Sequence, residues 1–402
     1  MLNTKKFAII CLSLIPNAYL IKSVLDFLPD VTLVLYIICY CLCLVGIFNN
    51  KRKGIGFGLF DLCVILFITL LLISLTYSPY PNVGIIKISK VSLLGFGLVY
   101  LVRFFVRNKN DFDLLLKSYL VGSLILGIVV LVNFITLGMP FGRFSFYGAH
   151  PIPLSMMGSV ALLIGITFFV NKKINLLYFA ILSGVNVWVI LVSSSRGPLL
   201  SLIIVLILIV PSLIKNFKKF LGLTLIILIV FYYFSKTTQY EFLKKRLEGM
   251  GDDKSSMARF YLYDQAEKII SKNPFMGNGI GVFNDKYPHN IFLEVYADSG
   301  ILAVILVAVL FLWIGYKYIT YLTKNRANYY FFLPIGLTLI PVIVLLYSFT
   351  YMDLKFLYIG LGLVLAQQNF HSENQRHIIS AKDLNKFKDN KRVGLKKYKI
   401  SW

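Results

Sequence analysis

The sequence predicts an all-α polytopic membrane protein with about twelve membrane-spanning helices. Of its 402 residues, 58% are hydrophobic and only 15% are charged, whereas a soluble globular protein carries about 25% charged residues. The mean hydropathy is +0.76. The apolar stretches are too long and too continuous for the alternating strands of an outer-membrane barrel. The composition therefore excludes both a soluble protein and a barrel.

Twelve stretches approach the length of about 20 apolar residues that a bilayer requires. The first is the least regular, because it contains Pro16, Lys22 and Asp26. It lacks a small-residue cleavage site, so we interpret it as a span and not as a signal peptide. The predicted spans are 7–28, 31–48, 58–77, 85–106, 114–137, 154–170, 175–193, 197–214, 219–235, 291–316, 328–349 and 352–368.

The distribution of positive charge predicts how these spans are oriented. The net charge is +23, and the lysines and arginines collect in every second loop, as they do in cytoplasmic loops. Both termini are therefore expected in the cytoplasm, and no nucleic-acid partner is expected. Residues 1–368 form the membrane domain. The basic tail, 369–402, is expected either to lie on anionic lipid headgroups or to be solvated.

Arg143, Arg196 and Arg259 lie on the outer side against this charge rule. Arg196 lies between two spans that almost no loop separates, which keeps it near the membrane surface. Guanidinium makes paired hydrogen bonds with phosphate and keeps its charge, so a phosphate-bearing lipid is the expected ligand. Lys87 and Lys90, on one helix face, are weaker candidates for the same anion site. The alternatives are snorkelling to headgroups or solvation of a loop.

The long loop, residues 236–290, is expected to be external, because long loops translocate largely regardless of charge. Ser255-Ser256 can cap a helix that ends at Asn273-Pro274, and Arg259 would then lie in its first turn. The glycines of Gly277–Gly281 occupy every second position, which permits a sharp bend. This segment predicts a tight turn that returns the loop to the membrane.

His289 precedes the tenth span. The positive end of a helix dipole favours the neutral imidazole, which can accept a proton. Glu294 and Asp298 follow at membrane depth, where ionisable groups are functional candidates. A structural interfacial histidine is the alternative for His289, and pairing or packing before a kink at Gly300 is the alternative for Asp298. The five cysteines lie in apolar spans without metal-ligand spacing, so we expect no metal.

Three segments in order resemble the O-antigen ligase and O-antigen polymerase superfamily. They are Ser193–Gly197, the Ala258-Arg259 helix with Asn273–Gly279, and His289–Glu294 with Gly300-Ile301. The resemblance implies a twelve-span fold of the GT-C glycosyltransferase kind, with a helical periplasmic loop between spans nine and ten. It also implies an undecaprenyl-diphosphate-linked oligosaccharide as donor and no metal, nucleotide sugar or other cofactor. The expected location is the bacterial inner membrane, with a periplasmic active site.

The resemblance also implies roles for individual residues. Arg196 and Arg259 match the arginines that bind the diphosphate, and Arg143 matches a less uniform family position. His289 matches the histidine that takes the proton from the acceptor hydroxyl, in a single displacement that inverts the anomeric centre. The sequence departs from the family pattern near Asp298 and Ala303, which leaves details of the span-ten helix open.

The resemblance is compatible with two acceptors, and other classes of protein remain alternatives to a glycosyltransferase. A polymerase extends a second lipid-linked glycan, whereas a ligase transfers the glycan to lipid A–core. The segment Tyr287–Glu294 favours the polymerase, and a protein O-oligosaccharyltransferase is a third possibility. A transporter of polysaccharide or lipid-linked oligosaccharide would show internal repeats and interrupted helices at the midplane. A lipid-binding scaffold would need the arginines but not His289.

Overall fold

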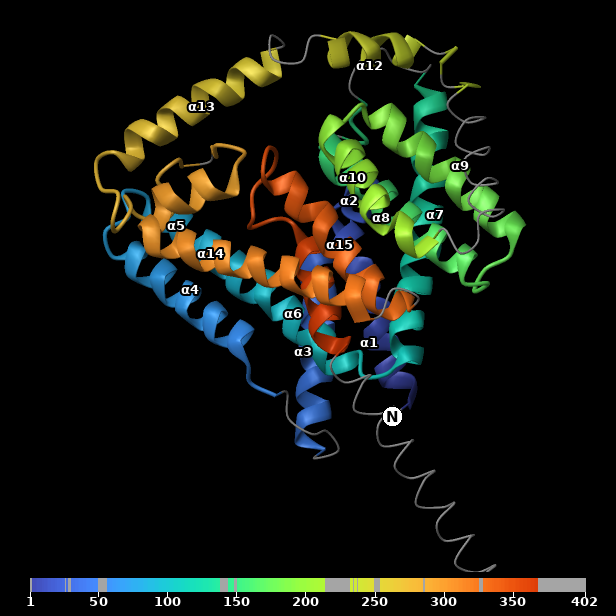
Figure 1. The fold of residues 1–402 in the computed structure, drawn as a ribbon, viewed down its shortest axis with the longest axis horizontal. Coiled ribbons are helices and arrows are strands. Elements are labelled where there is room, and N and C mark those ends of the chain that lie inside the picture. Colours follow the sequence, from blue (N-terminus) through green and yellow to red (C-terminus); the bar gives the residue numbers. More distant parts are fainter. Residues whose placement is uncertain are drawn as a thin grey trace, which may run out of the picture.

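A computed structural model describes residues 2–25, 27, 30–49, 56–137, 144–147, 150–213, 232–233, 235–236, 238–248, 254–284, 286–324 and 328–367. This part of the chain is helical and contains no strand, as the sequence predicts. Figure 1 shows a bundle of apolar helices, with two further helices, α12 and α13, along one edge. Arg143, the tail 369–402 and almost all of the predicted ninth span lie outside the described residues.

Within the described residues, seven helices are long and apolar enough to cross a membrane, and four more are apolar but shorter. All lie on predicted spans, while the count of twelve stays a prediction. The first of these eleven consists of α1 (Leu2–Leu14) and α2 (Ala18–Val24), and the one over Pro81–Phe105 includes α5 (Pro81–Ser89) and α6 (Gly97–Phe105). The others are α3 (Val31–Phe48), α4 (Leu59–Leu75), α7 (Lys109–Thr136), α8 (Pro151–Val170), α9 (Leu176–Ser193), α10 (Arg196–Leu213), α14 (Ile291–Lys324), α15 (Tyr329–Leu345) and a last helix, Lys355–Gln367.

Two of the spans change their helical pitch along their length. The first span passes from α1 through a 3₁₀ turn, η1 (Ile15–Asn17), into α2, because Pro16 supplies no N–H for a regular helix. The fourth span contains a π-helical stretch, η2 (Lys90–Phe96), between α5 and α6. It begins at Pro81, four residues before the predicted start, and proline is favoured at the first helical position.

Contacts between distant segments hold both ends of the bundle. One end carries the loops that the charge rule assigns to the cytoplasm, and ion pairs fasten it. These pairs are Lys5–Asp111, Arg103–Asp61 and Lys173–Asp113. The other end carries the predicted outer loops, joined by hydrogen bonds to backbone carbonyls, such as those from Tyr77 to Met276 and from Asn290 to Leu346. The outer loops therefore meet each other at one end.

Helix α14 is interrupted at Gly300, which has φ 75° and ψ −173°. A side chain there would collide with the backbone of Phe275, so only glycine fits. The predicted kink is confirmed. The glycine segment follows the break closely: Asn278 N–H donates to Ala297 O (2.7 Å) and Gly279 N–H donates to Asp298 O (3.1 Å). The returning loop thus binds the backbone that the interrupted helix leaves unpaired.

The described part of the long loop contains two helices, α12 (Thr238–Glu248) and α13 (Lys254–Ile270). Of the two, only α13 is predicted from the sequence, and its predicted start, with Ser255-Ser256 as the cap, is wrong. The helix begins at Lys254, so Ser255-Ser256 lie inside its first turn and do not cap it. Arg259 consequently lies in the second turn. The last part of α13 packs on the first part of α14 through Ala266, Phe283 and Ala297.

Candidate active site

The connection between α15 and the last helix, residues 346–354, joins the outer ends of several helices. The Tyr347 hydroxyl donates to Gly197 O at 2.8 Å and lies 3.0 Å from Ser201 Oγ. A Cβ atom at Gly197 would lie 3.2 Å from the Tyr347 ring. Tyr347 therefore lies directly against the first turn of α10, which begins at Arg196.

Arg259 approaches the same tyrosine from the long loop. Burial raises the pKa of Tyr347, and the Ser201 hydrogen bond and the Arg259 charge oppose that rise. Arg259 also opposes the rise that burial causes in the pKa of Tyr263, one turn along α13. Its guanidinium is thus within electrostatic reach of Tyr347. Both predicted arginines are half-buried; Arg196 is the chain neighbour of Gly197, which Tyr347 contacts, and the Arg259 charge acts on the same tyrosine.

His289 is held at the start of α14 by its neighbours. The side chain of Asn290 caps the helix, because its Oδ1 accepts hydrogen bonds from Phe292 N–H (2.9 Å) and Leu293 N–H (3.2 Å). His289 itself has φ 57°, a left-handed conformation that a residue before a cap adopts only when its surroundings fix it. Its Nδ1 accepts a hydrogen bond from Phe349 N–H at 3.2 Å. His289 is thus bound to the same short connection that carries Tyr347.

Tyr287 completes the surroundings of His289. The two ring centroids lie 4.6 Å apart in an edge-on arrangement. Burial raises the pKa of Tyr287 to about 12, and the charges of Glu294 and Asp353 add to the rise. The phenol is therefore protonated at neutral pH, so it can donate a hydrogen bond.

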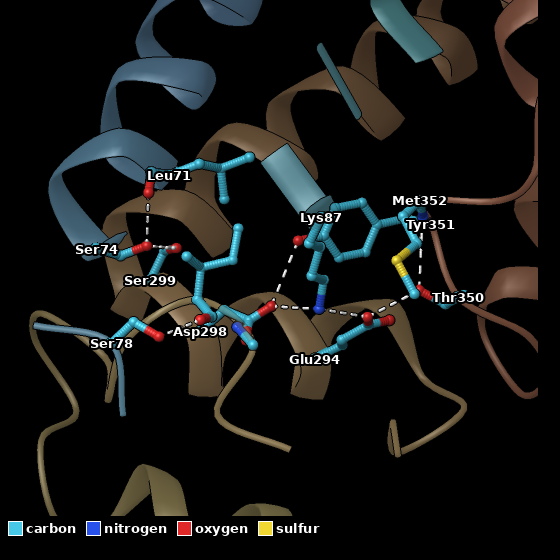
Figure 2. Close-up of polar contacts among 12 residues, drawn as sticks. Leu71, Ser74, Ser78, Lys87, Glu294, Asp298, Ser299, Thr350, Tyr351 and Met352 are labelled. Carbon is cyan, nitrogen blue, oxygen red and sulfur yellow. Dashed lines mark hydrogen bonds and ion pairs between the residues drawn. The ribbon is translucent and has the colours of Figure 1, made fainter. Parts of the chain in front are cut away.

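Lys87 and Glu294 form part of a buried ion cluster (Figure 2). The ammonium group lies 2.6 Å from Glu294 Oε1 and 2.6 Å from Asp298 Oδ2. Thr350 Oγ1 donates to Glu294 Oε1 at 2.8 Å, and Gly281 N–H donates to Asp298 Oδ1 at 3.0 Å. The cluster therefore links α5, α14, the glycine segment and the 346–354 connection.

Both weaker lysine candidates have carboxylate partners in the structure. Lys87, which was expected to face an anionic ligand, is directed at two carboxylates from α14, and its side chain is only 6% exposed. Lys90 pairs with Asp353 at 3.0 Å in a setting where both side chains are more than a third exposed. Asp298 has the pairing role that the sequence analysis named as an alternative.

Lys87→Met is expected to lower the free energy of unfolding by about 3–5 kcal/mol, because it leaves two buried carboxylates without their cation. Thermal melting of the purified protein in detergent measures the effect. Lys90→Met is the matched control, with an expected loss below about 1 kcal/mol for its part-exposed pair. Adding Glu294→Gln and Asp298→Asn to Lys87→Met should restore most of the stability. A Lys87→Met protein that melts with the wild type would show that the cluster does not support the fold.

The 346–354 connection was missed by the sequence analysis. Tyr347, Phe349 and Tyr351 alternate there with Ser348 and Thr350, between two apolar stretches that leave almost no loop. Alternating aromatic and hydroxyl residues in so short a connection were a signal that it is packed and hydrogen-bonded.

Comparison with protein families matches residues 177–308 to the model described as O-antigen ligase. The matched segment includes Arg196, Arg259 and His289, and it supports the superfamily that the motifs resemble. Members of this family are glycosyltransferase-like enzymes, and the match and the apolar helices together indicate a multi-pass membrane protein. Comparisons with curated proteins and with solved structures found no match.

Proposed function

We infer, from this place in the O-antigen ligase and O-antigen polymerase superfamily, that the chain transfers a glycan from undecaprenyl diphosphate to an acceptor hydroxyl. One observation supports the proposal: the backbone of Gly197 next to Arg196, the charge of Arg259 and the ring of His289 all act on residues 347–349 of one connection. Two fixed cations suit a diphosphate, and the imidazole suits a proton acceptor.

The reaction is a single displacement at the anomeric carbon of the donor. The acceptor oxygen forms the new bond to that carbon while the bond from carbon to the phosphate oxygen breaks. The electron pair of the broken bond goes to the diphosphate, where Arg196 and Arg259 stabilise the added negative charge. The hydroxyl proton goes to His289, and the anomeric configuration inverts.

The hydrogen bond at His289 defines where the acceptor must arrive. Because Nδ1 accepts from Phe349 N–H, the neutral ring carries its own proton on Nε2. A proton can be taken up only at Nδ1. The acceptor hydroxyl must therefore approach beside Phe349 and replace or share that backbone hydrogen bond.

The proposed acceptor is a second lipid-linked glycan, so that the enzyme polymerises repeat units of a surface polysaccharide. The residues of Tyr287–Glu294 resemble the polymerases more than the ligases, and this resemblance supports the choice. Transfer to lipid A–core is the alternative within the superfamily. A transporter of lipid-linked oligosaccharide is the alternative of another class, and it would leave the sugar–phosphate bond intact.

The products of the purified protein distinguish these functions. With lipid-diphosphate glycan as the only substrate, a polymerase yields longer lipid-linked chains. Glycan joined to added lipid A–core identifies a ligase. We expect transfer to continue in the presence of EDTA, since the resemblance implies a reaction without metal. Vesicles in which intact lipid-linked glycan crosses the membrane without cleavage would support the transporter instead.

We propose that the end carrying this site is periplasmic and that both termini are cytoplasmic. Reporter fusions after Lys254 and at the C-terminus test the proposal. The expected result is an external signal after Lys254 and a cytoplasmic one at the C-terminus. A cytoplasmic signal after Lys254 would place Arg259 and His289 in the compartment opposite to the one that the proposal requires.

A further inference from the structure

A cavity of about 570 Å³ lies beside the proposed active site. Its walls come from the first span, the start of α3, the π-helical stretch η2, the start of α8 and the 346–354 connection. Arg196, Arg259 and His289 do not line it. Its volume falls within the range of about 300–1,000 Å³ that is usual for small-ligand sites. The cavity therefore has the size of a ligand site and is lined by residues other than the two arginines.

Two lining residues place the cavity against His289. Tyr287 and Phe349 both line it. The Tyr287 ring lies 4.6 Å from the His289 ring, and the Phe349 N–H binds His289 Nδ1 at 3.2 Å. A hydroxyl at this wall would thus lie next to the nitrogen that has to take up the proton.

Charged side chains of both signs line the cavity. Lys22, Lys90 and Lys355 line it together with Asp30 and Asp353. Lys90 pairs with Asp353 at 3.0 Å, and Lys355 interacts electrostatically with both aspartates. A diphosphate needs a surplus of positive charge, whereas a saccharide uses hydrogen-bond donors and acceptors together. The lining therefore suits a polyhydroxylated ligand better than a second phosphate group.

We propose that this cavity binds the acceptor saccharide, with the attacking hydroxyl at the wall formed by Tyr287 and Phe349. The inference rests on the proposed glycosyl transfer and deepens it, because it separates an acceptor space from the donor's arginine pair. Tyr19 and Phe356, which also line the cavity, supply apolar ring faces to the sugar. The cavity holds the reacting end of the acceptor and not its lipid.

Adjacent residues of η2 provide a matched pair of variants. Leu94 lines the cavity, whereas Leu93 does not and is 59% exposed. Leu94→Trp should fill the space and raise KM for the acceptor at least about tenfold, with KM for the donor unchanged. Leu93→Trp should leave both constants at the wild-type values. The acceptor probe is the oligosaccharide freed by mild acid from the lipid-linked donor, titrated at saturating donor.

A second variant, Asp353→Asn, tests the cavity without depending on how well the fold accommodates the tryptophan of Leu94→Trp. Asp353→Asn removes a charged acceptor without adding bulk, and it should raise KM for the same oligosaccharide about tenfold, the equivalent of one hydrogen bond to a charged group. Binding of this oligosaccharide to His289→Ala protein, measured by calorimetry, provides a readout without turnover. Leu94→Trp added to that protein should abolish the binding.

The outcomes separate this inference from the proposed function. Wild-type protein that transfers no glycan at all would overturn the proposed function, whatever the cavity binds. Normal transfer with an unchanged acceptor KM in both Leu94→Trp and Asp353→Asn would overturn the cavity assignment alone. Displacement of the bound oligosaccharide by pyrophosphate would identify the cavity as an anion site and would also overturn the assignment.

Discussion

Arg196→Ala and Arg259→Ala should each lower glycan transfer by at least about a hundredfold, while the amount of protein in the membrane stays normal. Removing one preorganised donor that stabilises developing charge costs about 10²–10³ in rate, and two guanidinium groups share that task here. Both side chains are half-buried. Arg196→Lys should recover only part of the rate, because ammonium lacks the paired donors of guanidinium.

Initial rates with purified lipid-diphosphate glycan measure this effect, with protein levels checked in the same membranes. Lys268→Ala is a suitable control on α13, since Lys268 is 72% exposed and pairs only with Asp264 on its own helix. It should behave as wild type. Full activity in Arg196→Ala or in Arg259→Ala would remove that arginine from the proposed diphosphate site.

His289→Ala should retain binding of the lipid-linked donor but turn over at least about a hundredfold more slowly, the usual contribution of a positioned base. Two further variants test which nitrogen acts. Asn can accept the Phe349 N–H but cannot take up a proton, and Gln can donate in place of the Nε2–H. Both should be as slow as His289→Ala. A His289→Gln enzyme with most of the wild-type rate would show that the histidine donates a hydrogen bond and is not the base.

The pH dependence gives an independent check on the same residue. A base must be unprotonated to act, so wild-type transfer should fall when the pH is lowered far enough to protonate the base. The residual activity of His289→Ala should lose this acid limb. An acid limb of equal size in both proteins would assign that titration to another group.

The membrane architecture could be predicted because it depends on local composition. Each apolar stretch shows its own length, and Gly300 and Pro16 mark irregular backbone wherever their neighbours lie. The arginines and His289 were found because they broke the charge rule or matched a family motif. Their convergence on one connection could not be read from spacing, because it depends on how α10, α13 and α15 pack.

The role of Lys87 shows why the rest could not be predicted. From the sequence, a lysine near the outer end of a span is a cation without a partner, so an anionic ligand is the natural expectation. Its actual partners, Glu294 and Asp298, lie on a helix more than 200 residues away. No local pattern encodes which distant helix supplies the counter-charges. The start of α13 was predicted incorrectly for a simpler reason. Two adjacent serines suit a helix cap and a first helical turn almost equally, so they do not show which position they occupy.

The long stretch of sequence between Lys87 and its carboxylate partners also determines when their ion pairs can form during synthesis. Lys87 leaves the ribosome 207 residues before Glu294, an interval of roughly 10–40 s at about 5–20 residues per second. During that time Lys87, near the outer end of its span, is without the two carboxylates that it binds in the folded protein. The buried ion cluster is therefore completed only after α14 has been synthesised, so a chain that ends before α14 lacks the cluster.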